Sequence, residues 1–244
     1  MQASNLDEAI EWQNSVDYGL TGGIHSLDPM EIEEWLKKVQ VGNAYVNRHI
    51  TGAIVNRQPF GGWKRSAVGV GAKTGGPDYL FQLGKWQPTG PIELSAAEQD
   101  DAYWWENYYS VEHDPSNLFC EANILRYQPR ANLIIRISSD ANEIEVQRVL
   151  SAVNRTGMSY EVSNEKEISN NQFAESLSSS RFGRIRLIGT TTQPVRQAAI
   201  AAEIHLIDAP VTSSGRLELR WYLQEQAISR TLHRFGNLVN AATN

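Results

Sequence analysis

The side chains that most often carry out covalent or metal chemistry are few in this sequence and poorly spaced for it. The single cysteine, Cys120, has no obvious general base beside it, so the pattern favours a small buried apolar residue over a reactive thiolate. No two of the five histidines show metal-ligand spacing with a third ligand nearby. No pair of carboxylates is singled out by spacing as an acid–base couple.

The glycine-rich stretch 69–75 (GVGAKTG) is similar to a phosphate-binding loop but departs from both known patterns. A Walker loop needs glycine directly before Lys-Thr, where this chain has Ala72. A dinucleotide fingerprint needs glycine at the position of Thr74. We therefore interpret 51–77 as a long, defined loop path, as its density of Gly and Pro indicates.

Composition narrows the class of protein. The chain has 244 residues and a net charge of -6, which argues against general nucleic-acid binding. No stretch approaches the roughly 18 consecutive apolar residues of a membrane span. One cysteine excludes an internal disulfide framework. These features predict a cytoplasmic protein, and the alternation of strands and helices in 131–244 predicts an α/β fold.

Three zones of the chain are expected to position any site. Residues 1–86 predict helices over 6–15 and from Asp28-Pro29 to about residue 39, then a short strand over 44–47. Residues 87–130 are interpreted as an irregular, aromatic-rich linker that packs on its neighbours. Residues 131–244 alternate strands and helices, which predicts a mostly parallel sheet covered on both faces. Their final element is predicted as a helix over 217–229.

Residues 3–86 contain a series of short motifs in a specific order. They are 17–26 (DYGLTGGIHS), 41–48 (VGNAYVNR), 51–55 (TGAIV), 58–62 (QPFGG) and 71–77 (GAKTGGP). The series resembles the end of the catalytic domain of aldehyde dehydrogenases. It is most similar to pyrroline-5-carboxylate dehydrogenases, including those fused in proline utilization A.

The tail adds a second resemblance. Its motifs are 208–211 (DAPV), 215–219 (GRLEL), 222–229 (YLQEQAIS) and 233–237 (HRFGN). Together these motifs resemble the C-terminal region of the longer proline utilization A proteins, whose tail motif corresponds to residues 215–238 of this chain. In that family the preceding α/β domain looks like a decayed copy of a Rossmann-like nucleotide-binding domain, and the strand–helix pattern of 131–210 agrees with this.

The resemblance implies roles for three residues of this chain. The backbone N–H groups of Gly52 and Ala53 would anchor the α-carboxylate of glutamate γ-semialdehyde, and some relatives have serine at the position of Ala53. Phe60 would line the aldehyde pocket against the substrate's methylenes, although ordinary core packing is the alternative. The tail would close the substrate tunnel like a lid, or else dock as a plain terminal helix that only adds stability.

The resemblance also implies what this chain lacks. In the family the cysteine nucleophile, the glutamate base and the domain that binds NAD all precede the point where this chain begins, and Cys120 does not match that nucleophile. The implied parent is an NAD-dependent L-glutamate γ-semialdehyde dehydrogenase of proline catabolism. The chain alone is expected to be inactive, with no catalytic, cofactor-binding or metal-binding residue and no bound NAD.

Two other hypotheses remain open. The chain could be a non-catalytic assembly module that completes a partner chain, such as a missing N-terminal dehydrogenase portion, and it is expected to form a homo-oligomer. It could also be an independent enzyme that uses Cys120, which the sequence favours least.

Overall fold

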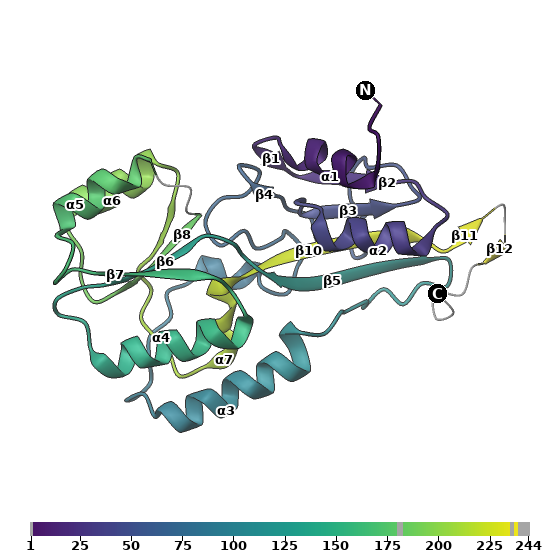
Figure 1. The fold of residues 1–244 in the computed structure, drawn as a ribbon. Coiled ribbons are helices and arrows are strands. Elements are labelled where there is room, and N and C mark those ends of the chain that lie inside the picture. The colour runs from purple at the N-terminus through teal and green to yellow at the C-terminus, as the bar shows by residue number, and fades with distance from the viewer. Residues whose placement is uncertain (1, 180–182, 235–236, 239–244) are drawn as a thin grey trace. The chain divides into compact units, whose positions relative to one another are not determined.

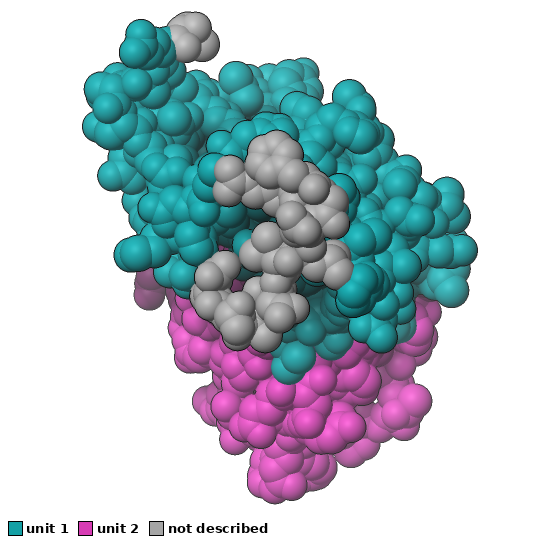
Figure 2. Space-filling model, turned by 90° about the vertical axis from the view of Figure 1, so that its right-hand side faces the viewer, with its two compact units in different colours: residues 1–83, 111–127, 225–244 teal, residues 84–110, 128–224 magenta. Residues whose placement is uncertain are grey.

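The chain forms two compact units, each assembled from separate stretches of sequence. The structure is a computed structural model that describes residues 2–179, 183–234 and 237–238. Unit 1 contains 1–83, 111–127 and 225–244, and unit 2 contains 84–110 and 128–224, coloured teal and magenta in Figure 2. The domain boundaries at 86 and 130 stay a prediction, because compactness does not show which segments form separate domains.

Unit 1 is built around a four-stranded sheet of order β2-β3-β10-β5 (Figure 1). Strands β2 and β10 both run parallel to β3. The elements are α1 (Leu6–Asn14), β1 (Tyr18–Gly19), β2 (Thr21–Ile24), α2 (Pro29–Lys38), β3 (Asn43–Val46), β4 (Trp63–Lys64), η1 (Tyr79–Leu83), β5 (Glu121–Pro129), β10 (Leu223–Thr231), β11 (His233–Arg234) and β12 (Asn237–Leu238). Phe235 and Gly236 of the tail motif lie outside the described residues.

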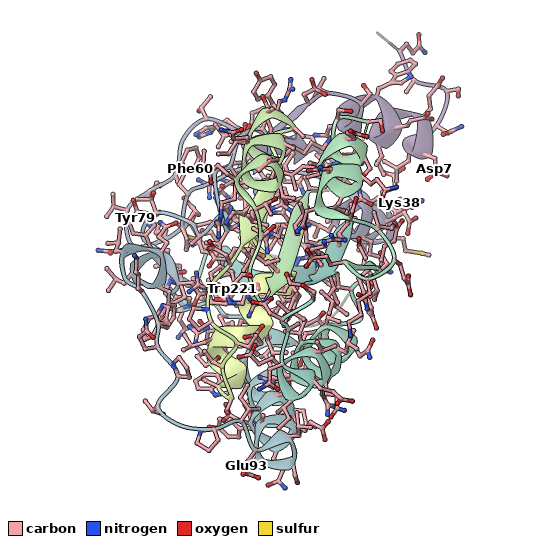
Figure 3. All side chains as sticks on the ribbon, turned by 90° about the vertical axis from the view of Figure 1, so that its left-hand side faces the viewer. Asp7, Lys38, Phe60, Tyr79, Glu93 and Trp221 are labelled. Carbon is pink, nitrogen blue, oxygen red and sulfur yellow. The ribbon has the colours of Figure 1, made fainter. Side chains whose placement is uncertain are left out.

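The two helices of unit 1 begin where the sequence predicts. Asn5 accepts a hydrogen bond from the Glu8 N–H and caps α1, and Asp28 accepts one from the Met30 N–H and caps α2. Lys38 at the end of α2 donates to Asp7 of α1 at 2.7 Å, both labelled in Figure 3. The helices pack with one face of the sheet in a core of Ile10, Ile32, Trp35, Val39, Val41, Ala44, Val46 and Ile228.

Unit 2 contains the predicted parallel sheet, and the α/β fold class is confirmed. Its strand order is β7-β6-β8-β9, with every neighbouring pair parallel. Helices α5 and α6 lie on one side of the sheet and α4 on the other (Figure 1). The elements are α3 (Leu94–Trp104), the π-helix η2 (Trp105–Tyr109), β6 (Leu133–Ile137), α4 (Glu143–Thr156), β7 (Tyr160–Asn164), α5 (Asn170–Leu177), β8 (Arg184–Ile188), α6 (Gln193–Ala201), β9 (His205–Ile207), α7 (Gly215–Glu218) and η3 (Leu219–Tyr222).

Two predicted elements were wrong. Residues 87–130, expected to be irregular, contain helix α3 and the nine-residue strand β5. A helix was expected over 217–229. Instead, this segment contains the last two residues of α7, then η3, and then most of strand β10. The apolar stripe of this segment fits a helix, but pairing with β3 about 180 residues earlier places it in a sheet.

Buried arginines are the main departure from an apolar core in unit 2. Arg136, Arg148, Arg184 and Arg186 are all fully buried. Arg148 of α4 holds Asp101 of α3 through two hydrogen bonds of 2.6 and 2.8 Å. Because a buried guanidinium is tolerated only when it is paired, this bidentate contact fixes α3 against α4.

No helix in the described part of the chain combines the length and the hydropathy that a membrane-spanning segment needs.

We predict that Arg148→Met destabilises unit 2 by about 3–5 kcal/mol, because it leaves the Asp101 carboxylate buried without its partner. The matched control is Arg196→Met, which removes an ion pair with Asp208 whose side chains are 38% and 48% exposed. That change should cost at most about 1 kcal/mol. Urea unfolding of both variants provides the measurement, and equal losses would contradict the prediction.

Candidate functional site

One face of strand β3 holds both ends of the loop that follows it. The Tyr45 hydroxyl donates to the Gly52 carbonyl at 2.9 Å, and the Asn43 side-chain amide donates to the Pro59 carbonyl at 3.0 Å. Side chains two residues apart on a strand point to the same face and lie about 7 Å apart. The loop 52–59 therefore leaves β3 and returns to it within a short span, which makes it a defined structure.

Gly52 and Ala53 lie at the first end of this loop. Gly52 is exposed with a φ of 72°, in the left-handed region, and a Cβ added there would meet nothing within 4 Å. Ala53 is half-buried. In the described part of the chain, neither N–H group donates a hydrogen bond. The backbone conformation thus suits glycine, and both N–H groups remain available to an anion.

The middle of the loop is folded by a buried amide. Gln58 accepts from the Ile54 N–H at 2.7 Å and donates to the Asn123 side chain at 2.7 Å. The Gln58 N–H donates in turn to the Ile54 carbonyl at 3.2 Å. This closed turn orders the residues between the two ends without an apolar core of its own.

Phe60 lies directly after the second end of the loop, before β4 (Figure 3). Its N–H and carbonyl exchange hydrogen bonds of 3.0 Å with Thr74, and its side chain is half-buried. The structure therefore places the three predicted site residues at the two ends of one loop, with Gly52 and Ala53 at one end and Phe60 at the other.

One carboxylate lies between two arginines near the loop. Glu121 accepts from Arg48 at 2.9 Å and from Arg57 at 2.5 Å. The two cations share this single negative charge, so one positive charge is left over beside the loop. That charge would add to the attraction of an anion for the backbone N–H groups that the resemblance implies.

A buried cluster of ionisable groups lies beside the same loop. Lys73 and Glu225 are fully or almost fully buried, and the Lys73 N–H donates to the Glu225 carboxylate at 2.8 Å. Burial, together with the neighbouring Asp78 carboxylate, raises the pKa of Glu225 to about 8. Burial lowers the pKa of Lys73 to about 7. Tyr127 donates to Asp78 at 2.8 Å and completes the cluster.

Three other candidates receive no support as sites. Cys120, expected to be buried, is exposed. It lies at the surface because it immediately precedes β5, whose burial begins at Glu121. The stretch 69–75 is followed by turns and does not open an α-helix. Among the described residues, no group of three or more His, Cys, Asp or Glu could hold a metal ion.

The parallel sheet of unit 2 does not fit a dinucleotide. In such sheets the ligand binds where the strand order reverses, here beyond the ends of β6 and β8. Asp140 crosses this point and accepts from the Thr190 N–H at 3.0 Å and its hydroxyl at 2.8 Å. Glu165 accepts from the Ser139 N–H at 2.7 Å. Carboxylates thus occupy backbone donors that a pyrophosphate would need, and they would also repel it.

The sequence prediction missed several residues that organise this region, among them Asn43, Tyr45, Gln58, Lys73 and Glu225. The one available signal was the alternation in 43–46, where polar Asn43 and Tyr45 share a face opposite Ala44 and Val46. Burial of the others depends on contacts far apart in sequence.

We predict that wild-type stability falls relative to Glu225→Gln as the pH rises from about 4.5 to about 8. The unfolded chain releases this proton near pH 4.5, whereas the folded chain retains it to about pH 8, so the folded state is disfavoured across that window. Across this window the free energy of unfolding of the wild type, measured in urea, should fall by about 2–4 kcal/mol relative to that of Glu225→Gln. Glu33→Gln, at an exposed position on α2, should follow the wild type. A constant difference between wild type and Glu225→Gln would contradict the prediction.

Comparison with known proteins agrees with the motif series. The aldehyde dehydrogenase family model matches residues 1–86. The chain is 48% identical over 79 residues to 1-pyrroline-5-carboxylate dehydrogenase 2 of Bacillus subtilis, covering 32% of this chain and 15% of that protein. It is 42% identical over 100 residues to the bifunctional protein PutA of Escherichia coli, covering 41% of this chain and 7% of that protein.

A solved structure matches nearly the whole chain. It is proline utilization A from Corynebacterium freiburgense, with a TM-score of 0.81 and 41% identity, covering 98% of this chain and 25% of that one. The chain therefore spans a quarter or less of each of these relatives. Residues 1–86 are similar to the corresponding segment of aldehyde dehydrogenases, and the chain shares its fold with the matching part of proline utilization A.

Proposed function

We propose that this chain is part of an NAD-dependent L-glutamate γ-semialdehyde dehydrogenase of proline catabolism, in which it supplies the substrate-anchoring loop and the tunnel lid. The observation that carries the proposal is the loop 52–59, whose two ends are held on one face of β3. Such a loop can present an anion site and an apolar wall at a constant separation.

The anion site is formed by the N–H groups of Gly52 and Ala53. Aimed backbone donors bind a carboxylate without placing a bulky cation in the pocket. The apolar wall is Phe60, which contacts the methylenes between the substrate's carboxylate end and its aldehyde. Together they would favour an aldehyde that carries a carboxylate a few carbons away.

The tail is proposed to act as the lid. Its motif enters β10, which pairs with β3 in the register Ala227–Asn43 and Ser229–Tyr45. These two partners on β3 are the residues that hold the loop. A lid attached to that strand would be kept in a fixed position over the substrate loop.

The chemistry itself is proposed to need sequence beyond this chain. The resemblance assigns the cysteine nucleophile and the glutamate base elsewhere, and NAD, when bound, accepts the hydride from the aldehyde carbon. The parallel sheet of unit 2 does not fit a dinucleotide, as its Asp140–Thr190 contact argues. The missing dehydrogenase portion is therefore the expected partner, on the same chain or a separate one, within a homo-oligomer.

An assembly function is a second candidate. In the described part of unit 1, β2 is an edge strand with β3 as its one neighbour. An edge strand presents unpaired N–H and carbonyl groups that another chain can extend. Coelution with a separately expressed dehydrogenase portion, without any gain in its activity, would favour this candidate over the proposal above.

We predict that the chain alone forms no NADH from glutamate γ-semialdehyde and NAD, and that Cys120→Ala behaves identically, because the exposed Cys120 is not the nucleophile. Absorbance at the NADH band checks both. Turnover by the wild type that Cys120→Ala abolishes would establish an independent enzyme and overturn the proposal.

We predict that Ala53→Ser strengthens substrate binding in the enzyme reconstituted with the remaining dehydrogenase portion. The added hydroxyl gives the carboxylate one more donor, so KM for glutamate γ-semialdehyde should fall about 3- to 10-fold. Propionaldehyde, which lacks the carboxylate, is the control and should keep its KM. An equal change for both substrates would place the carboxylate away from this loop.

A further inference from the structure

A buried lysine lies against the loop segment that carries Phe60. Lys73 is fully buried, and its ammonium group donates to the side-chain oxygen of Asn43 at 3.3 Å and to the Gly61 carbonyl. The backbone approaches closely here, because a Cβ added to Gly42 would lie 2.0 Å from the Gly61 carbonyl oxygen and 2.8 Å from the lysine Nζ. A side chain at position 42 would therefore displace the Gly61 carbonyl or the lysine.

Asn43 holds the same segment from the strand. Its amide donates to the Pro59 carbonyl at 3.0 Å, and its side-chain oxygen accepts from the Gly61 N–H at 3.1 Å. Phe60, between them, exchanges both of its backbone hydrogen bonds with Thr74, the residue after Lys73. Three consecutive residues are thus fixed by backbone contacts on either side of the aromatic ring.

The lysine charge is balanced within unit 1. Glu225 and Asp78 are buried beside Lys73 and hydrogen-bond to each other. Two carboxylates can share a hydrogen bond only when one proton lies between them, which leaves a single negative charge on the pair. That charge offsets the ammonium, so the buried group as a whole is neutral and the lysine can keep its contact with Gly61.

We propose that Asn43 and Lys73 are positioning residues that set the place of Phe60 and thereby the enzyme's preference for a long, carboxylate-bearing aldehyde over a short one. The inference rests on the proposed role of Phe60 as the apolar wall. Neither residue touches substrate in this proposal. Each acts through the backbone of 59–61.

The first experiment measures amide hydrogen exchange in this chain and does not depend on turnover. Lys73→Met keeps the length of the side chain but removes its donors, so exchange at the Phe60, Gly61 and Thr74 amides should rise at least about 10-fold. Asn43→Asp keeps the acceptor but loses the donor to Pro59, and it should give a smaller rise at the same amides. Unchanged exchange in helix α2, which lies in the same unit, shows that unit 1 of the variants is folded.

The matched control is Lys64→Met. Lys64 also donates to backbone carbonyls of unit 1, those of Asn14 and Val16, but it does not contact the segment 59–61. It should leave the Phe60, Gly61 and Thr74 amides unchanged. Equal rises in the two lysine variants, or no rise in Lys73→Met, would overturn the positioning role.

The second experiment measures selectivity in the reconstituted enzyme. For Lys73→Met, the ratio of kcat/KM for glutamate γ-semialdehyde to that for propionaldehyde should fall about 10-fold, with most of the loss in KM for the longer substrate. Lys64→Met should keep the wild-type ratio. A wild-type ratio in Lys73→Met despite faster exchange would overturn the selectivity role.

Failure of the proposed function would look different. If Phe60→Ala left the selectivity ratio unchanged, Phe60 would not be the pocket wall. The exchange result would still decide whether Asn43 and Lys73 hold the segment.

Discussion

The parallel pairing of β3 with β2 and β10 is the constraint on which unit 1 depends. Because side chains alternate along a strand, the four residues of β3 serve two purposes. Ala44 and Val46 enter the apolar core with α1 and α2, while Asn43 and Tyr45 hold the loop on the opposite face. A shift of β3 by one residue against both of its neighbours would exchange these faces, so pairing between distant segments determines whether the loop is held.

The elements predicted from sequence are those whose signals are local. The caps at Asn5 and Asp28 and the strand–helix alternation after residue 131 depend on neighbouring residues, and each was found where expected. Strand β10 was missed because its local pattern fits a helix, and only its pairing with β3 makes it a strand. Helix α3 was missed because its aromatic end suggested an irregular linker, although its first half is rich in helix-forming Ala, Glu and Gln.

The site, like the fold, was predictable only in part. Resemblance led to Gly52, Ala53 and Phe60, and the structure places them at the two ends of one loop. The groups that hold this loop were not predictable, because a lysine or glutamate in a sequence is by default a solvated charge. Lys73 and Glu225 are 152 positions apart, and the burial of the lysine becomes reasonable only once its ammonium lies beside the single negative charge that Glu225 and Asp78 share.

The contact between Asp140 and Thr190 has a consequence for protein engineering. A designer wishing to give unit 2 a nucleotide would meet two obstacles together: the Asp140 carboxylate on the Thr190 N–H and the Glu165 carboxylate on the Ser139 N–H. Position 189 offers no remedy, because a Cβ added to Gly189 would lie 2.6 Å from Asp140 Oδ1. Removing either acid alone leaves the other to repel phosphate. A nucleotide site at this point of the sheet would therefore require changes at both acids together.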